Sequence, residues 1–365
     1  MSLGVTEIRR AKLRFGLLTG AVTLLVFLVL LLSTLSNALV SSLVGALDGL
    51  NAEGLVYSDV ARDNIAASRL EQGTVDAVAQ VPGVAAAAGL GTFTTAAVLP
   101  DGPGDIQVFG FSPAGPGAPT GLREGSLPSA PGQAAVDGGG FSIGDTIVLD
   151  PAGTTLTVVG LLRGAQFNAS PTAYVDLATY EQAVSATNPG LPFVPLNAVA
   201  FDVVPGQDPA AVATAITEQV PGAVGYTRAA AVAAIPGIES ITQSFGILVG
   251  LTFIIGIVVI GFFFLILTVQ KLRAFTLLRA IGTSSARLAV SVALQITVVV
   301  LVASVLALGL TLLAVQGLNT GIPVTLSPPL IIGTVLAVLA FSLLAGLLSV
   351  RRIVRIDPAT AVGAR

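Results

Sequence analysis

The chain has no cysteine, no histidine and no tryptophan, and its only methionine is Met1. Disulfide bonds, metal or haem sites built from thiolate or imidazole ligands, and catalysis by cysteine or histidine are therefore excluded within the chain. The phosphate-binding pattern G-x-x-x-x-G-K-[ST] is also missing, because no glycine is followed by lysine. The chain therefore encodes no nucleotide site of this kind and no metal cofactor of its own.

Charge is missing from three long stretches, 15–47, 240–270 and 288–350. A transmembrane helix needs about 20 apolar residues, so the first two stretches each hold one helix. The third is interrupted by the Gly- and Pro-containing segment 317–329 and holds two. A soluble protein does not contain an uncharged stretch as long as 288–350. We therefore expect an α-helical membrane protein with four transmembrane helices, one before and three after a large polar segment.

The same stretches divide the chain into nine parts. We expect a cytoplasmic N-terminus (1–14), a first transmembrane helix with a stalk (15–47), an extracytoplasmic domain (48–239), a second transmembrane helix with a stalk (240–270), a cytoplasmic coupling loop (271–287), a third helix (288–316), an outer loop (317–329), a fourth helix (330–350) and a cytoplasmic tail (351–365). The alternative for the first helix is a cleaved signal peptide. Its apolar run, 15–32, is longer than a signal core of about 7–15 residues, so we expect it to be retained.

The distribution of charge predicts the orientation. The short segments 1–14, 271–287 and 351–365 hold 12 of the 17 basic residues, whereas segment 48–239 has 18 acidic and five basic residues, a net charge of −13. Lys and Arg close to transmembrane helices remain on the cytoplasmic side. Both termini are therefore predicted on the cytoplasmic side of a cell membrane, and the large domain is predicted on its outer side. Attraction to anionic lipid explains the basic segments, and nothing indicates nucleic-acid binding.

The outer segment reads as an α/β (α+β) domain, because short β-branched runs alternate with helical patterns between Gly and Pro turns. We expect strands at 54–58, 106–111, 146–149, 154–162 and 198–204 and helices at 72–80, 176–186 and 208–219. The first and last helices are followed by similar turns, Gln80-Val-Pro-Gly83 and Gln219-Val-Pro-Gly222. Such a repeat favours two related halves, although the Ala-, Val- and Gly-rich composition also allows chance similarity. The run 99–131 is interpreted as a mobile connection or an insertion between the halves.

The 271–287 loop carries the most specific pattern in the chain. Lys271-Leu-Arg-Ala-Phe-Thr-Leu-Leu-Arg-Ala-Ile-Gly282 predicts a short amphipathic helix that ends at Gly282. Such a helix either fits into the groove of a partner or lies at the membrane surface as an ordinary interfacial helix. The residues alone leave both interpretations open.

This pattern, the terminal Arg355-Ile-Asp-Pro-Ala-Thr-Ala361 and the one-plus-three layout resemble the FtsX-like permease family of ABC transporters, which includes the MacB type. The sequence is most similar to the DevC/HrtB-like exporter group. The resemblance implies a permease homodimer with two copies of a separate ABC ATPase, which uses ATP and Mg²⁺. It also implies stalk helices that extend outward from the first two transmembrane helices.

The resemblance places the ATPase contacts in two short segments. The residues it implies are Lys271, Arg273, Phe275, Leu277, Leu278, Arg279, Ile281, Gly282, Asp357 and Pro358. The predicted function is a permease subunit, not itself an enzyme, that couples ATP hydrolysis by its partner to export of a hydrophobic or amphiphilic substrate by mechanotransmission. The alternative is an FtsX-like regulator that activates an extracellular cell-wall hydrolase.

The exporter group makes haem one candidate substrate beside lipid and peptide. Without His, Cys or an internal Met, an iron ligand would have to be Tyr or a carboxylate. The candidate substrate residues, near the outer ends of the first two transmembrane helices, are Ser33, Asn37, Glu53, Tyr57 and Glu239. Capping or interfacial anchoring is the alternative role for the last three.

Overall fold

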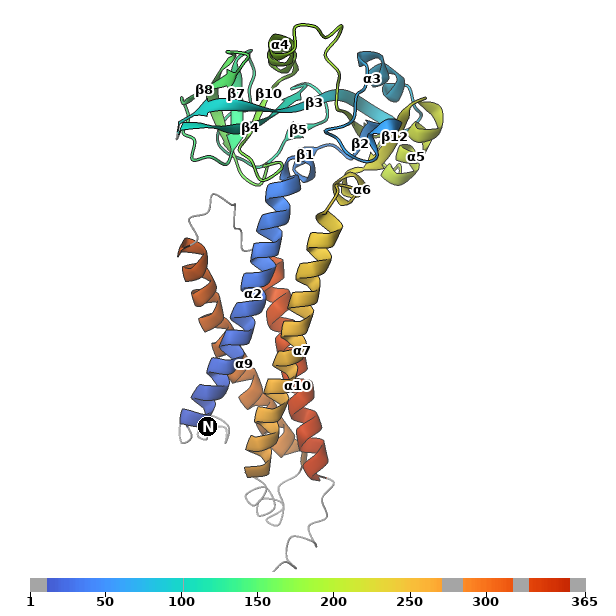
Figure 1. Cartoon of the computed structure of the whole chain (residues 1–365). Helices are drawn as coiled ribbons and strands as arrows, with labels where there is room; N and C mark the ends of the chain where they lie inside the picture. Colours follow the sequence, from blue (N-terminus) through green and yellow to red (C-terminus); the bar gives the residue numbers. More distant parts are fainter. Residues whose placement is uncertain (1–11, 101, 271–284, 318–327, 355–365) are drawn as a thin grey trace, which may run out of the picture. The chain divides into compact units, whose positions relative to one another are not determined.

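The computed structural model describes residues 12–100, 102–270, 285–317 and 328–354 (Figure 1). The chain divides into two compact units, which are described separately. A helical unit comprises the described parts of 1–36, 243–319 and 324–365, and an outer unit comprises 37–242. The segments 271–284, 318–327 and 355–365 lie outside the described residues.

The helical unit contains α2 (Lys12–Asp48), α7 (Ile238–Gln270), α9 (Ser285–Gly317) and α10 (Pro328–Val354), of which α2 and α7 continue into the outer unit. The first three are long and apolar enough to cross a membrane, whereas the described apolar part of α10 is shorter. Helices suit a bilayer because they satisfy their backbone hydrogen bonds internally. A membrane protein is thus confirmed, and the fourth crossing stays a prediction.

The helices of this unit pack through one apolar cluster. On α2 its members recur every four residues, so they share one face of the helix, and they meet residues of α7, α9 and α10: Leu18, Val22, Val26, Leu30, Ile260, Ile296, Val300, Ala303, Ala307 and Val338. At Gly256 of α7 an added Cβ would overlap the side chain of Leu25, which packs directly over this glycine. Helix α7 is otherwise the least covered helix, with 11% of its apolar window buried against 39% for α2.

The outer unit is built on a ten-stranded sheet. The strand order is β12-β2-β11-β3-β4-β10-β7-β9-β6, and β8 pairs with both β3 and β9. The strands are β2 (Gly54–Ser58), β3 (Val84–Leu99), β4 (Gly102–Phe111), β6 (Leu122–Gly125), β7 (Gln133–Asp137), β8 (Thr146–Asp150), β9 (Thr155–Leu162), β10 (Thr172–Asp176), β11 (Ala198–Val203) and β12 (Ala223–Thr227). Two residues of β1 (Leu50–Asn51) pair separately with β5 (Ala118–Pro119).

Two strand–helix–strand units form one half of this sheet. The first is β2, α3 (Gln72–Ala79) and β3, and the second is β11, α5 (Pro209–Gln219) and β12. Their strands interleave in the order β12-β2-β11-β3. The repeated turns after the helices place Gly83 and Gly222 at positive φ, +97° and +74°, a conformation that glycine adopts without strain. The echo in the sequence thus corresponds to two units of the same form.

The sheet buries a different apolar cluster on each face. Leu55 and Tyr57 of β2 face a cluster that includes Leu47 at the end of α2 and Ala231 of α6 (Arg228–Ala233). The intervening Val56 faces α3 and α5 on the other side. Helix α4 (Leu177–Thr187) covers the neighbouring strands on that second side. Figure 1 shows α4 and the end of α2 on opposite sides of the strands.

All eight elements expected in the outer domain are present, with ends that shift by up to four residues. The sequence analysis missed β3, β7, β10 and β12, of which β3 and β7 are rich in alanine, a weak strand former. The interpretation of 99–131 as a mobile connection was wrong, because this run contains β4, β5 and β6, whereas the alternative of an insertion between the halves agrees with their position in the chain. Strand β4 pairs with β3 from Gly91 to Leu99 and occupies the middle of the sheet, which its Gly- and Pro-rich start conceals in the sequence.

Tyr57 offers a test of this core. Its hydroxyl is buried and has no hydrogen-bond partner among the described residues, and burial raises its pKa above the usual range. Because an unpaired buried polar group costs about 1–3 kcal/mol, we expect Tyr57→Phe to stabilise the protein against thermal unfolding. The matched control is Tyr174→Phe, which removes a 2.8 Å bond to the carbonyl of Ala165 and should destabilise. A lower melting temperature for Tyr57→Phe would contradict this account.

Candidate functional site

The predicted ATPase-coupling residues lie outside the described residues. This applies to Lys271, Arg273, Phe275, Leu277, Leu278, Arg279, Ile281 and Gly282, and to Asp357 and Pro358. Their role therefore stays a prediction from the sequence. The described part of the chain offers a different candidate, the junction at which α2 enters the outer unit.

The five candidate substrate residues have different environments. Ser33 lies half-buried on α2 in the helical unit, and Asn37 lies exposed on the part of α2 that belongs to the outer unit. Glu239 is exposed in the first turn of α7. Tyr57 is enclosed in the core, with its ring 5.5 Å from that of Tyr226. Glu53 is hydrogen-bonded to the sheet, and the assignment of all five to substrate stays a prediction.

Glu53 ties the segment after α2 to two other parts of the outer unit. Its carboxylate accepts a 2.7 Å hydrogen bond from the Val203 amide, and its own amide donates to the Phe201 carbonyl. Its carbonyl accepts from the amide of Arg228 at the start of α6. The Arg228 guanidinium also donates to the carbonyl of Leu50 at 2.8 Å. The chain that leaves α2 is thus joined to the chain that leads into α7.

A shallow acidic cleft adjoins this connection. It has a volume of about 480 Å³, and its charged lining residues are Asp48, Glu53, Asp202, Asp208 and Arg228. Burial raises the pKa of Asp202, and the nearby charge of Glu53 adds to this effect. Among the described residues no group of three or more carboxylates is arranged to hold a metal ion. The cleft therefore gives no basis for a catalytic or metal site.

The end of α2 is held by the loop 163–171. The amides of Asn168 and Ala169 donate to the carbonyls of Leu43 and Ser42 at 3.1 and 2.9 Å, and the Ala46 amide donates to the Gln166 carbonyl at 2.8 Å. These bonds join the last two turns of α2 to the loop. Because Asn168 and Ala169 have positive φ, 51° and 54°, their left-handed backbone turns the two amides toward the helix.

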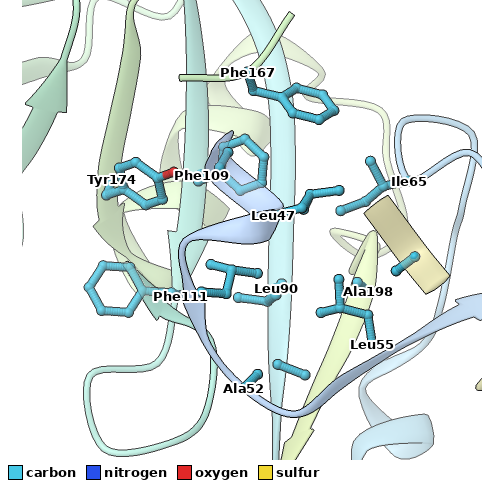
Figure 2. Packing of buried hydrophobic residues seen from close by; sticks show 14 of the residues in the cluster. Leu47, Ala52, Leu55, Ile65, Leu90, Phe109, Phe111, Phe167, Tyr174 and Ala198 are labelled. Atoms are coloured by element: carbon cyan, nitrogen blue, oxygen red, sulfur yellow. The ribbon is translucent and has the colours of Figure 1, made fainter. Parts of the chain in front are cut away.

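Two glycines set the distance between helix and loop. A Cβ added to Gly45 would lie 2.5 Å from the carbonyl oxygen of Gly164, which is closer than a real contact. Leu47, two residues further along α2, is fully buried, and Figure 2 shows it between the aromatic rings of Phe109 and Phe167 and the side chain of Ile65. The last turns of α2 are therefore an integral part of the outer domain's core.

Asp137 supports the loop from behind. Its carboxylate accepts from the Ala165 amide, and the Tyr174 hydroxyl donates to the Ala165 carbonyl at 2.8 Å. Burial raises the pKa of Asp137, and hydrogen bonds from backbone amides offset this only in part. Sequence analysis did not find this arrangement, since a buried aspartate looks like any surface acid in a sequence.

The raised pKa of Asp137 predicts how stability depends on pH. Because the ionised form is disfavoured in the folded state, the stability that this group contributes is greatest below its unfolded pKa, about 3.9, and is lost as pH rises through the folded pKa. We expect the melting temperature of the wild type to fall relative to that of Asp137→Asn between pH 4 and 7. Asp105→Asn, at an exposed carboxylate, is the control for charge removal. A difference that is independent of pH would contradict this expectation.

Comparison with known proteins covers both units. Residues 15–219 match the family described as MacB-like periplasmic core domain, and residues 246–358 match the FtsX-like permease C-terminal family. An uncharacterized ABC transporter permease of Mycobacterium tuberculosis (strain H37Rv) is 29% identical over 290 residues, 78% of this chain and 77% of the relative. A putative hemin transport system permease protein of Staphylococcus haemolyticus is 29% identical over 111 residues, 30% of this chain and 32% of the relative.

The periplasmic region of MacB from Actinobacillus actinomycetemcomitans superposes with a TM-score of 0.38 at 9% identity, covering 54% of this chain and 94% of that structure. The family assignment rests on the sequence matches, of which the MacB-like one alone spans more than half of the 365 residues. With its apolar helices and outer α/β unit, the chain belongs to the ABC transporter permeases of the MacB/FtsX type.

Proposed function

We propose that this chain is the permease subunit of an ABC-type efflux system, in which a separate ATPase drives export of a hydrophobic or amphiphilic substrate by mechanotransmission. The observation that carries the proposal is the continuity of α2. Its 37 residues extend about 55 Å, beyond a hydrocarbon core of about 30 Å, and its last turns are bound into the outer domain. A helix anchored in this way transmits displacement along its axis.

The proposed force path begins in the cytoplasm. The ATPase grips the 271–287 loop and the tail around Asp357, movement passes to α2 and α7, and the outer unit moves with the ends of both helices. The excess of Lys and Arg in the cytoplasmic segments supports this orientation. We propose two permeases with two ATPases, and the little-covered surface of α7 is available to a second copy and to lipid.

Haem is proposed as one candidate cargo beside lipid and peptide. The support is the name of the staphylococcal relative, a putative hemin transport permease, together with the resemblance to the exporter group. Loss of the gene should raise the toxicity of haem, peptides or detergents if the protein exports one of them. A cell-wall or division defect with unchanged toxicity would instead favour the regulator of a hydrolase.

The coupling loop can be tested through the ATPase. We expect an ABC ATPase to copurify with the chain. Leu278→Asp and Arg279→Glu should each lower the ATPase activity of the complex about tenfold or more, because each change places a negative charge in the proposed contact. Arg9→Glu makes the same charge reversal in another cytoplasmic segment and should leave the activity unchanged. If activity survived both loop changes, the loop would not be the ATPase contact.

The junction of α2 can be tested through the separation of ATPase activity from export. In Gly45→Ala the added methyl group displaces the loop at Gly164, a change that costs about 1–3 kcal/mol in a packed site. We expect ATPase activity to continue while resistance to the substrate falls. The matched control is Gly20→Ala on the same helix, where an added Cβ meets nothing within 4 Å. Normal resistance in a correctly folded Gly45→Ala protein would exclude this transmission path.

A further inference from the structure

A groove of about 730 Å³ lies on the face of the outer unit that carries α3 and α4. The first residues of α3, one side of α4 and the segment after α4 form its walls. The lining residues are Glu71, Gln72, Gly73, Ala178, Glu181, Gln182, Ser185, Phe193 and Val194. This is the opposite face of the sheet from the one on which the end of α2 packs.

The packing of α4 explains which side chains the groove receives. Tyr180, Ala183 and Val184 are buried against the strands, with the ring of Tyr180 directly over Gly91 and Gly110. The helix must therefore turn Ala178, Glu181, Gln182 and Ser185 outward, since these positions lie one helical turn apart on its other side. This side of α4 is exposed and uncovered by any described part of the chain.

The segment 188–196 adds exposed apolar surface beside the groove. Leu191 and Phe193 are 45% and 52% exposed, and prolines at 189, 192 and 195 stiffen the chain around them. Reciprocal backbone bonds between Leu196 and Leu70, 2.8 and 3.0 Å, hold the end of the segment in place. A rigid aromatic side chain at the edge of a groove needs little ordering on binding, and such residues carry much of the energy in protein interfaces.

Charge limits what fits there. Two carboxylates, Glu71 and Glu181, line the groove, and no Lys or Arg is among its described lining residues. The side chain of Glu71 makes no capping hydrogen bond to α3, although it stands at the N-cap position. Because the whole outer segment carries a net charge of −13, a second copy of it is repelled and a basic partner is attracted.

We propose that this groove is the docking site for a basic segment of a partner protein outside the membrane. Lys or Arg side chains of that segment pair with Glu71 and Glu181, and an apolar side chain packs against Phe193. The proposal rests on the lining and charge of the groove, so it does not depend on whether the protein exports a substrate or regulates a hydrolase. Its failure therefore leaves the proposed function untouched.

Selection of random 12-residue peptides by display on the full-length protein in lipid nanodiscs tests the chemistry of the groove. We expect enrichment of peptides that combine Lys or Arg with Phe or Leu. Their affinity should fall about tenfold or more for Phe193→Ala and for Glu181→Lys, and it should weaken with added salt. The matched controls are Val98→Ala and Asp105→Lys on the β3–β4 hairpin, where Val98 is 55% exposed.

Three outcomes would overturn the proposal. The first is selection of acidic or uncharged peptides, and the second is equal loss of affinity in the groove variants and the hairpin controls. The third is transport of the selected peptide across the membrane with stimulation of the ATPase, which would make it a substrate. The Phe193→Ala and Glu181→Lys proteins should keep the melting temperature of the wild type, because both positions are exposed. A loss of affinity then reports on binding and not on unfolding.

Discussion

The structure of the outer unit depends on one apolar cluster beneath its sheet. This cluster contains Leu47 from α2, Leu55 and Tyr57 from β2, Phe109 from β4 and Ala231 from α6. Since no cysteine exists to cross-link the domain, apolar burial has to hold it together and attach it to its helices at the same time. The end of α2 cannot shift without disturbing the packing of the sheet.

Hydrogen bonds give this attachment a direction. The loop 163–171 donates to the carbonyls of Ser42 and Leu43 in α2, and Glu53 and Arg228 join the segment after α2 to the start of α6. Apolar contacts alone allow sliding, because they are not directional. Amides aimed at particular carbonyls restrict both rotation and translation of the helix. The combination of apolar burial and directed hydrogen bonds fixes the end of α2 in the outer unit.

Elements with a pattern that extends over many residues could be predicted from the sequence. Elements that depend on a single contact between distant residues could not. Uncharged runs identified the apolar helices, and short β-branched runs between Gly, Pro or Asp residues identified strands such as β8 and β9. The Ala-rich strand β3 was missed because alanine has a low intrinsic preference for strands. Its pairing with β4, a contact between distant parts of the chain, stabilises it instead. The loop 163–171 was missed for a related reason. Its contacts involve backbone amides, two residues with positive φ and the close approach of Gly45 to Gly164, none of which has a sequence pattern.

The strands that begin and end the outer unit are neighbours. Strand β2 follows α2 closely, β12 precedes α6 and α7, and the two strands pair from Gly54↔Thr227 to Ser58↔Ala223. Everything between them, including the long β3–β4 hairpin, α4 and the groove, is an insertion whose two ends meet at one place. Evolution can therefore vary α4 and the groove without altering the pairing of these two strands, whereas loss of the loop 163–171 would free the end of α2.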